Sequence, residues 1–126
     1  MSDELKSLQN YIQVLQKELA TGNATEHTHR PALKALIESL SQGVTATNEP
    51  SRIECGAPDY VISKGVLTIG YIEAKDVGKS LDEVEKLEQL ERYRDSLSNL
   101  ILTDYLQFRW YVNGERRLSA TLGIST

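Results

Sequence analysis

Three polar residues in the middle of the chain have the types and the spacing that metal-assisted hydrolysis requires. Asp59 precedes an apolar stretch, and Glu73 and Lys75 follow it. Side chains two positions apart in a β-strand lie on the same face, so Glu73 and Lys75 project together. A strand–turn–strand arrangement with its turn at Lys64-Gly65 returns Asp59 to that face. We therefore expect two carboxylates and one ammonium group to converge at one edge of a sheet.

This combination of charges predicts a cation site. Ionised carboxylates held close together repel each other, and a pKa rises unless a positive charge lies between them. Mg²⁺ prefers oxygen ligands and commonly uses one or two protein carboxylates together with phosphate oxygens and water. A bound cation lowers the pKa of a water ligand and stabilises charge on a phosphate group. Lys75 then either orients or deprotonates that water, or stabilises negative charge as an ammonium; the sequence leaves both roles open.

The size and composition of the chain are those of one globular domain. It has 126 residues, of which 40% are hydrophobic and 25% charged, enough to bury a single core. Its 14 basic and 18 acidic residues give a net charge of −4, which by itself does not indicate a nucleic-acid-binding protein. The lone Cys55 excludes an internal disulfide and is typical of a reducing cytosol. Without a signal peptide or an apolar run of membrane-spanning length, the sequence predicts a cytoplasmic protein with no membrane partner.

Two helices are predicted in the first third of the chain. Apolar residues recur every three or four positions from about residue 2 to residue 20, which indicates an amphipathic helix that Gly22 or Asn23 is suited to end. Pro31 belongs in the first turn of a second, shorter helix, where its missing N–H costs nothing, and Gly43 lies just past its end. From Val44 to Pro50 the residues predict a loop.

Strands dominate the middle of the predicted fold. They are expected near 51–55, 59–63 and 66–75, and the first two are compatible with one strand bent at Gly56 and Pro58. Four apolar side chains of the third strand are expected to be buried: Val66, Leu67, Ile69 and Ile72. We expect the site to lie at the bend of the second and third of these strands.

A helix and a final group of strands complete the pattern. Ser80 opens a capping box before a helix with an apolar stripe to about residue 97. A short strand follows at 100–103, and Asn113-Gly114 predicts a hairpin between strands at 107–112 and 116–122. The order of elements favours an α/β or α+β fold with a mixed sheet flanked by helices.

The arrangement Pro58-Asp59 followed by Glu73-Ala74-Lys75 resembles the PD-(D/E)XK nuclease family. The segment 25–33, which contains Glu26 and opens the second helix, is similar to the first core helix of these enzymes. Gln89 and Tyr93, four apart on a helix, resemble an element found in a subset of the family. The resemblance runs from about residue 25 to residue 105. It is strongest to the N-terminal nuclease domain of single-polypeptide restriction–modification enzymes, in which an adenine methyltransferase follows.

The resemblance implies a fold, an activity and a set of site residues. The fold would be the restriction-endonuclease-like αβββαβ core, and the activity Mg²⁺- or Mn²⁺-dependent hydrolysis of DNA phosphodiester bonds. The metal ligands would be Asp59, Glu73, the backbone carbonyl of Ala74 and Glu26. Lys75 would be the catalytic base or charge stabiliser, and Gln89 would position a phosphate or the Lys75 amine.

The resemblance also implies partners and an organisation. Residues 1–126 would be a single nuclease-like domain, with an N-terminal helix at 1–20, the core at 25–105 and a hairpin at 106–126. Its substrate would be double-stranded DNA, with dimerisation for double-strand cleavage and covalently linked methyltransferase or motor domains in a longer protein. Four side chains are candidate DNA contacts: Arg30, Lys64, Lys79 and Tyr93. Arg30 is equally suited to pair with a nearby acid, and the sequence leaves both of its roles open.

Two alternatives have the same sequence support for the fold but involve no cleavage. In the first, the chain is a catalytically inert nuclease-like module that binds nucleic acid or a partner protein. In the second, the N-terminal helix pairs with a partner chain through Leu8 and Leu15. A zinc site at His27 and His29 is disfavoured, because structural zinc needs four ligands and the sequence offers little beyond Cys55 to complete them.

Overall fold

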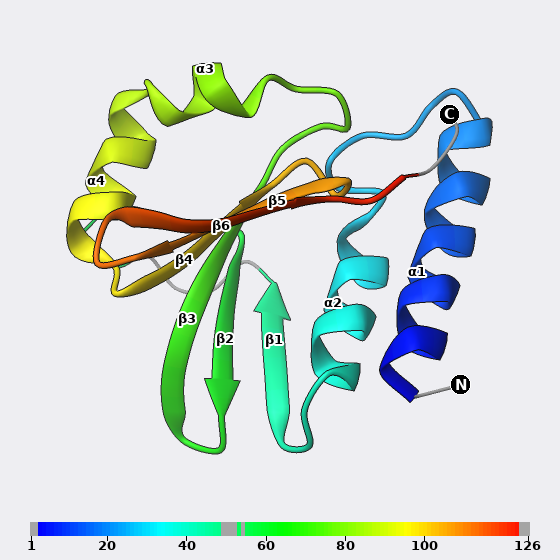
Figure 1. The fold of residues 1–126 in the computed structure, drawn as a ribbon, viewed down its shortest axis with the longest axis horizontal. Helices are drawn as coiled ribbons and strands as arrows, with labels where there is room; N and C mark the ends of the chain where they lie inside the picture. Colours follow the sequence, from blue (N-terminus) through cyan, green and yellow to red (C-terminus); the bar gives the residue numbers. More distant parts are fainter. Residues whose placement is uncertain (1–2, 49–52, 54, 124–126) are drawn as a thin grey trace.

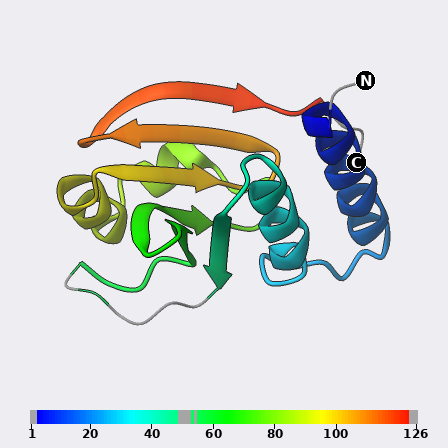
Figure 2. The same ribbon diagram turned by 90° about the horizontal axis from the view of Figure 1, so that it is seen from below.

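A mixed β-sheet forms the centre of the molecule, with helices on its two faces (Figures 1 and 2). The computed structural model describes residues 3–48, 53 and 55–123. In this described part the sheet has six strands in sequence order, and only β3 and β4 run parallel. The strands are β1 (Val44–Asn48), β2 (Tyr60–Lys64), β3 (Leu67–Ala74), β4 (Asn99–Thr103), β5 (Gln107–Val112) and β6 (Glu115–Thr121).

The predicted α/β class with an αβββαβ core is confirmed. Helices α1 (Asp3–Ala20) and α2 (Arg30–Ser39) pack against each other and cover one face of the sheet. Helices α3 (Leu81–Glu85) and α4 (Glu88–Ser96) cover the other face. Adjacent residues of β3 divide between the faces: Ile72 packs with the α1–α2 core, and Tyr71 packs with the α3–α4 core. This alternation is what a pleated strand requires.

The apolar stripe of α1 is used inside the domain. Leu15 is fully buried, and Leu8 packs against the same core cluster. The Tyr11 hydroxyl, also buried, donates a hydrogen bond to the carbonyl of Tyr105 (2.7 Å) and so links α1 to the sheet. The interpretation of Leu8 and Leu15 as a surface for a partner helix is therefore wrong.

The turns that position the helices and hairpins follow the sequence. Gly22 adopts a positive φ angle of 77° just after α1, as helix-ending glycines commonly do. Gly43, with φ 84°, lies in the turn between α2 and β1, where the Val44 N–H donates to the Ser41 carbonyl (3.3 Å). The Ser80 side chain accepts a hydrogen bond from the Glu83 N–H (3.3 Å) and caps α3. Asn113 and Gly114 both have positive φ in the β5–β6 turn, which is the geometry of a type I′ hairpin.

Two predicted segments differ from the structure. The segment predicted to be a loop at 44–50 contains strand β1, whose Ala46 is buried opposite Ile62. The helix predicted from Ser80 to about residue 97 is two helices, because Leu87 takes an extended conformation (ψ 142°) and remains half exposed.

The strand predicted at 51–55 is only partly tested. Residues 51, 52 and 54 lie outside the described residues. Ile53 forms an isolated bridge with Gly56, and Cys55 is buried against the α3–α4 core.

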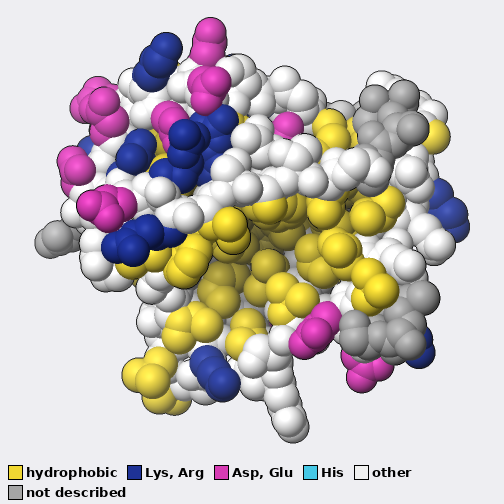
Figure 3. Space-filling view, in the orientation of Figure 1, with side chains coloured by type: hydrophobic (Ala, Val, Ile, Leu, Met, Phe, Trp, Pro, Cys, Tyr) yellow, Lys and Arg dark blue, Asp and Glu magenta, His cyan; other side chains and the backbone are white. Residues whose placement is uncertain are grey.

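The outer half of β3, residues 67–70, differs from the expectation that its apolar side chains are buried. Val66, Leu67 and Ile69 are exposed, and Ile72 alone of the four predicted core residues is buried. An apolar groove of about 190 Å³ lies along this part of the sheet, and Ile69 and Trp110 are among the residues that line it. Hydrophobic side chains gather in a hollowed part of this face in Figure 3.

None of the helices in the described part of the chain is both long and apolar enough to span a bilayer.

Candidate active site

Asp59 and Glu73 meet at the open end of the β2–β3 hairpin, opposite its turn. Tyr60 pairs with Ile72 across the two strands, so the next positions outward are Asp59 and Glu73. The Asp59 N–H donates to Glu73 Oε1 (3.3 Å), and the Ala74 N–H donates to Asp59 Oδ2 (2.8 Å). The hairpin thus brings the two carboxylates together as the sequence predicts.

Lys75 joins the same site. Its Nζ lies 3.2 Å from Glu73 Oε2, and its side chain is 22% exposed. The Lys75 N–H donates to the carbonyl of Thr103 (2.8 Å), just beyond the paired residues of β3 and β4. The parallel strand β4 therefore fixes the backbone that carries both Glu73 and Lys75.

The environment of Glu73 disfavours the charged form of its carboxyl group. Its side chain is 8% exposed, and burial raises its pKa to about 7, with a further contribution from the charge of Asp59. Lys75 acts in the opposite direction but does not cancel these effects. A carboxyl group half-protonated near neutral pH marks a place where an added cation would be stabilised.

Arg30 is the partner of Asp59 on the side away from Ala74. Its Nη2 lies 2.8 Å from Asp59 Oδ1, and the guanidinium is 11% exposed. The carbonyl of Arg30 accepts a hydrogen bond from the buried Tyr60 hydroxyl (2.9 Å). Of the two roles open to Arg30 in the sequence, a phosphate contact or an ion pair with an acid, the structure shows the ion pair.

Tyr93 and Gln89 lie on α4 beneath the site. Tyr93 is fully buried and its hydroxyl accepts a hydrogen bond from Gln89 Nε2 (3.1 Å). Burial, followed by the charge of Glu73, raises the pKa of Tyr93 to about 12. The Tyr93 ring fits against Gly56, where an added Cβ would lie 3.0 Å from the ring. Tyr93 therefore supports the segment that leads to Asp59, and its predicted contact with the DNA backbone does not fit its burial.

Glu26 is not drawn into the carboxylate pair. Its backbone N–H donates to Asp76 Oδ1 (2.6 Å), and its carboxylate lies 3.8 Å from His27 Nε2. Among the described residues, no three His, Cys, Asp or Glu side chains gather closely enough to hold a metal ion. The role of Glu26 as a metal ligand stays a prediction. Lys64 and Lys79 are both exposed, and their roles as DNA contacts also stay predictions.

The donor set at Asp59 and Glu73 nevertheless suits a hard divalent cation. The Asp59 N–H donates to Glu73 Oε1, and burial, with a further contribution from the charge of Asp59, raises the pKa of Glu73. Mg²⁺ needs no more than one or two protein carboxylates when water and phosphate complete its shell. The residues that would hold the ion are Asp59, Glu73 and the carbonyl of Ala74.

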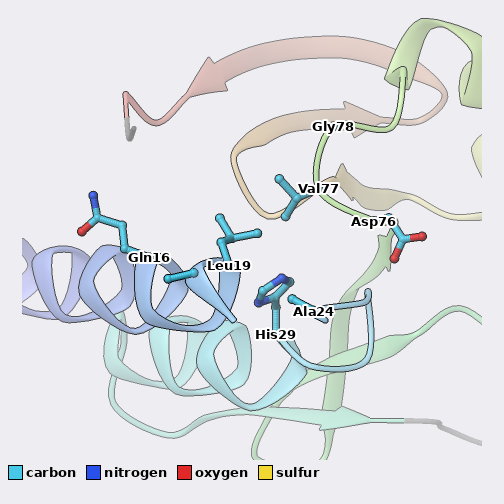
Figure 4. A pocket seen from close by; sticks show the side chains of 8 residues that line it. Gln16, Leu19, Ala24, His29, Asp76, Val77 and Gly78 are labelled. Atoms are coloured by element: carbon cyan, nitrogen blue, oxygen red, sulfur yellow. The ribbon is translucent and has the colours of Figure 1, made fainter. Parts of the chain in front are cut away.

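A separate cavity of about 450 Å³ lies between the end of α1 and the segment after Lys75 (Figure 4). His29 and Asp76 line it, whereas Asp59 and Glu73 do not. His29 is almost completely buried: its Nδ1 lies 2.9 Å from Glu18 Oε1, and its ring makes an edge contact with Tyr105. These contacts give His29 a structural role, because they link the start of α2 to α1 and to Tyr105.

The structure adds contacts that sequence reasoning missed. Tyr60 anchors the backbone of Arg30, and Gly56 makes room for the Tyr93 ring. Both residues flank Asp59 in the sequence, but only the three-dimensional path of α2 and α4 shows what they contact. The Gly-Ala-Pro-Asp segment does contain a signal for the second contact, because a glycine near a chemically important residue often indicates that another group packs closely against the backbone there.

Comparison with known proteins gives an informative likeness to a solved structure. No protein-family model matches this chain, and no curated protein matches it. A solved structure, the cryo-electron microscopy structure of a DrdV–DNA complex, aligns with 93% of this chain at 22% sequence identity and a TM-score of 0.78. The chain spans 12% of the length of that protein. At this identity the likeness shows the fold, which is compatible with the restriction-endonuclease-like class.

Proposed function

We propose that this chain is a metal-dependent endodeoxyribonuclease domain that hydrolyses phosphodiester bonds of double-stranded DNA. The observation that carries the proposal is the convergence of Asp59, Glu73 and Lys75 at one end of the β2–β3 hairpin. The likeness of the fold to part of a chain in a DNA complex supports the same substrate class. The PD-(D/E)XK resemblance, found independently in the sequence, supports the same reaction.

Each residue of the site has a defined task in this proposal. Asp59, Glu73 and the Ala74 carbonyl would hold Mg²⁺ or Mn²⁺, which supplies a water of lowered pKa and stabilises phosphate charge when bound. Lys75, held beside Glu73 Oε2 at 3.2 Å, orients the attacking water or neutralises charge on the phosphate. Gln89 donates a hydrogen bond to Tyr93 and so supports the segment that carries Asp59. Its role in positioning a phosphate or the Lys75 amine stays a prediction.

The larger context belongs to the same proposal. The chain corresponds to 12% of the DrdV chain, so we propose that it works as the cleavage module of a longer, cytoplasmic restriction–modification protein. Methyltransferase or motor domains would then supply DNA recognition, which fits the net charge of −4 of this domain. Dimerisation would place two such sites on the two strands.

Plasmid cleavage by the full-length protein tests the proposal. With Mg²⁺ or Mn²⁺ present, we expect Lys75→Ala to cut at least about a hundredfold more slowly than wild type, the scale of loss typical for a proton-transfer or charge-stabilising group. DNA binding should be largely retained, because one ammonium is a small share of the phosphate contacts. Lys6→Ala, at an exposed position of α1, is the matched control and should cut normally. Equal cutting by Lys75→Ala and wild type would contradict the role of Lys75.

An inert nuclease-like module remains the second candidate, and one observation favours it. Arg30 already supplies Asp59 with a positive partner at 2.8 Å, as a structural ion pair would. On that hypothesis, the wild-type protein would bind DNA but leave it intact with every divalent cation supplied.

A further inference from the structure

Arg30 is connected to the site through both its backbone and its side chain. It is the first residue of α2, and Pro31 follows in the first turn. Its carbonyl is held by the Tyr60 hydroxyl, and Tyr60 is the residue next to Asp59. Arg30 and Asp59 are thus connected twice, once through the backbone contact and once through their side chains.

The two oxygens of Asp59 have different partners. Oδ2 accepts a hydrogen bond from the Ala74 N–H (2.8 Å), which is neutral. Oδ1 lies 2.8 Å from a guanidinium nitrogen, which is permanently charged. Any cation that binds Oδ1 must therefore approach a fixed positive charge in a largely buried site, where charges are screened less than in water.

We propose that Arg30 is a positioning residue that competes with the divalent cation for the charge of Asp59. This inference rests on the proposed function. The guanidinium has two opposing effects on a cation: it fixes the orientation of the Asp59 carboxylate, and it repels the ion. Freezing a short side chain has a small effect on binding, whereas a like charge a few ångströms from a doubly charged ion has a large one. The repulsion dominates.

The consequence concerns when the ion binds. Before DNA arrives, the positive groups of Arg30 and Lys75 already lie beside the carboxylates of Asp59 and Glu73. A phosphodiester adds negative charge and offers the guanidinium another oxygen, because arginine suits phosphate as well as carboxylate. Arg30 thereby favours loading of the cation together with its phosphate substrate over loading of the free protein.

Calorimetric titration of the DNA-free, full-length protein with Mn²⁺ tests the competition. Arg30→Gln should bind Mn²⁺ about tenfold or more tightly than wild type, since a neutral side chain no longer repels the ion. Arg30→Lys, which keeps the charge, should stay near the wild-type affinity. Arg92→Gln removes an exposed arginine of α4 and is the matched control, also expected at the wild-type affinity.

The possible outcomes separate this inference from the proposed function. If wild type binds Mn²⁺ and Arg30→Gln binds it with the same or weaker affinity, the proposed competition is wrong, but the metal site is still supported. Absence of Mn²⁺ binding by every variant would overturn both. A measurement on the wild-type protein covers the case in which Arg30→Gln does not fold: Mg²⁺ should perturb the NMR signals of the Arg30 Nη groups. Unchanged Arg30 signals alongside shifted Asp59 and Glu73 signals would contradict the inference.

Discussion

The two ends of β3 invert the usual relation between polarity and burial. At the first end, Leu67 and Ile69 are apolar and yet 68% and 44% exposed. At the other end, Glu73 is ionisable and yet only 6% exposed, next to the buried Ile72 and Ala74. The residues belong to one continuous strand and differ in their surroundings.

The inversion follows from the topology of the sheet. Pairing between β3 and β4 begins at Tyr71 and Leu100, so the residues before Tyr71 have a strand neighbour on one side only. The later residues lie between β2 and β4 and beneath the helices, where apolar contacts surround them. A charged group placed there is costly unless it is paired, so its presence marks function more strongly than the same residue on the surface would.

Truncation of one isoleucine at each end should give the largest difference. Ile72→Ala removes a side chain that is 1% exposed, and we expect unfolding to become about 3 kcal/mol easier. Ile69→Ala removes a side chain that is 44% exposed, and we expect a change below about 0.5 kcal/mol. Urea denaturation of both variants measures the two values. Similar losses at the two positions would show that the ends of β3 are equally packed.

Removal of the charge at the buried end should change the pH dependence of stability. The pKa of Glu73 in the folded protein, about 7, is above its ordinary value of 4.5, so the folded state binds this proton more tightly than the unfolded chain. Without metal, stability should therefore fall as the pH rises from 4.5 to about 7. Glu73→Gln should remove on the order of 2 kcal/mol of this fall.

Chemical denaturation in chelator at pH 5 and pH 8 measures the effect. The Lys75 ammonium loses its partner in Glu73→Gln, which is why the slope with pH, and not the absolute stability, is the quantity to compare. If stability changes with pH to the same extent in wild type and Glu73→Gln, folding does not raise the pKa of Glu73.

Addition of a single methyl group at Gly56 should have a smaller effect on stability, and the effect should come from the segment beside Asp59. Gly56 has φ 135°, and an added Cβ would lie 3.0 Å from the Tyr93 ring. We expect Gly56→Ala to lose about 1 to 2 kcal/mol of stability from backbone strain and crowding, and to cut DNA more slowly because the Asp59 segment shifts. Gly43→Ala, with a positive φ of 84° but open space around it, isolates the strain. Equal loss of cutting in both variants would rule out the Tyr93 contact as the cause.

The sequence predicts those parts of the site that lie close together along the chain better than those that come from distant elements. Asp59, Glu73 and Lys75 lie on one hairpin, so strand periodicity and a turn at Gly65 suffice to bring them together. The ion pair of Arg30 with Asp59 depends on how α2 packs against the sheet, and no local pattern fixes that geometry. For the same reason the sequence left Arg30 with two roles and placed Tyr93 on the surface.

The errors in the fold have the same origin. The segment 44–48 is short and polar, and it becomes a strand because β2 pairs with it and α2 contacts its backbone: Glu38 accepts a hydrogen bond from the Ala46 N–H. The outer half of β3 has the composition of a core strand, but no helix covers it. Hydrophobicity predicts that a segment is a strand more reliably than it predicts which half of the strand is buried.

The location of the metal ion tests the account most directly. Crystals soaked in Mn²⁺ should show an anomalous scattering peak between the carboxylates of Asp59 and Glu73, at a bonding distance of about 2.0 to 2.3 Å from an oxygen of each. Glu73→Gln crystals soaked in parallel should lose the peak. A wild-type peak located elsewhere, or no peak at saturating Mn²⁺, would contradict the assignment of these residues to a metal-dependent nuclease site.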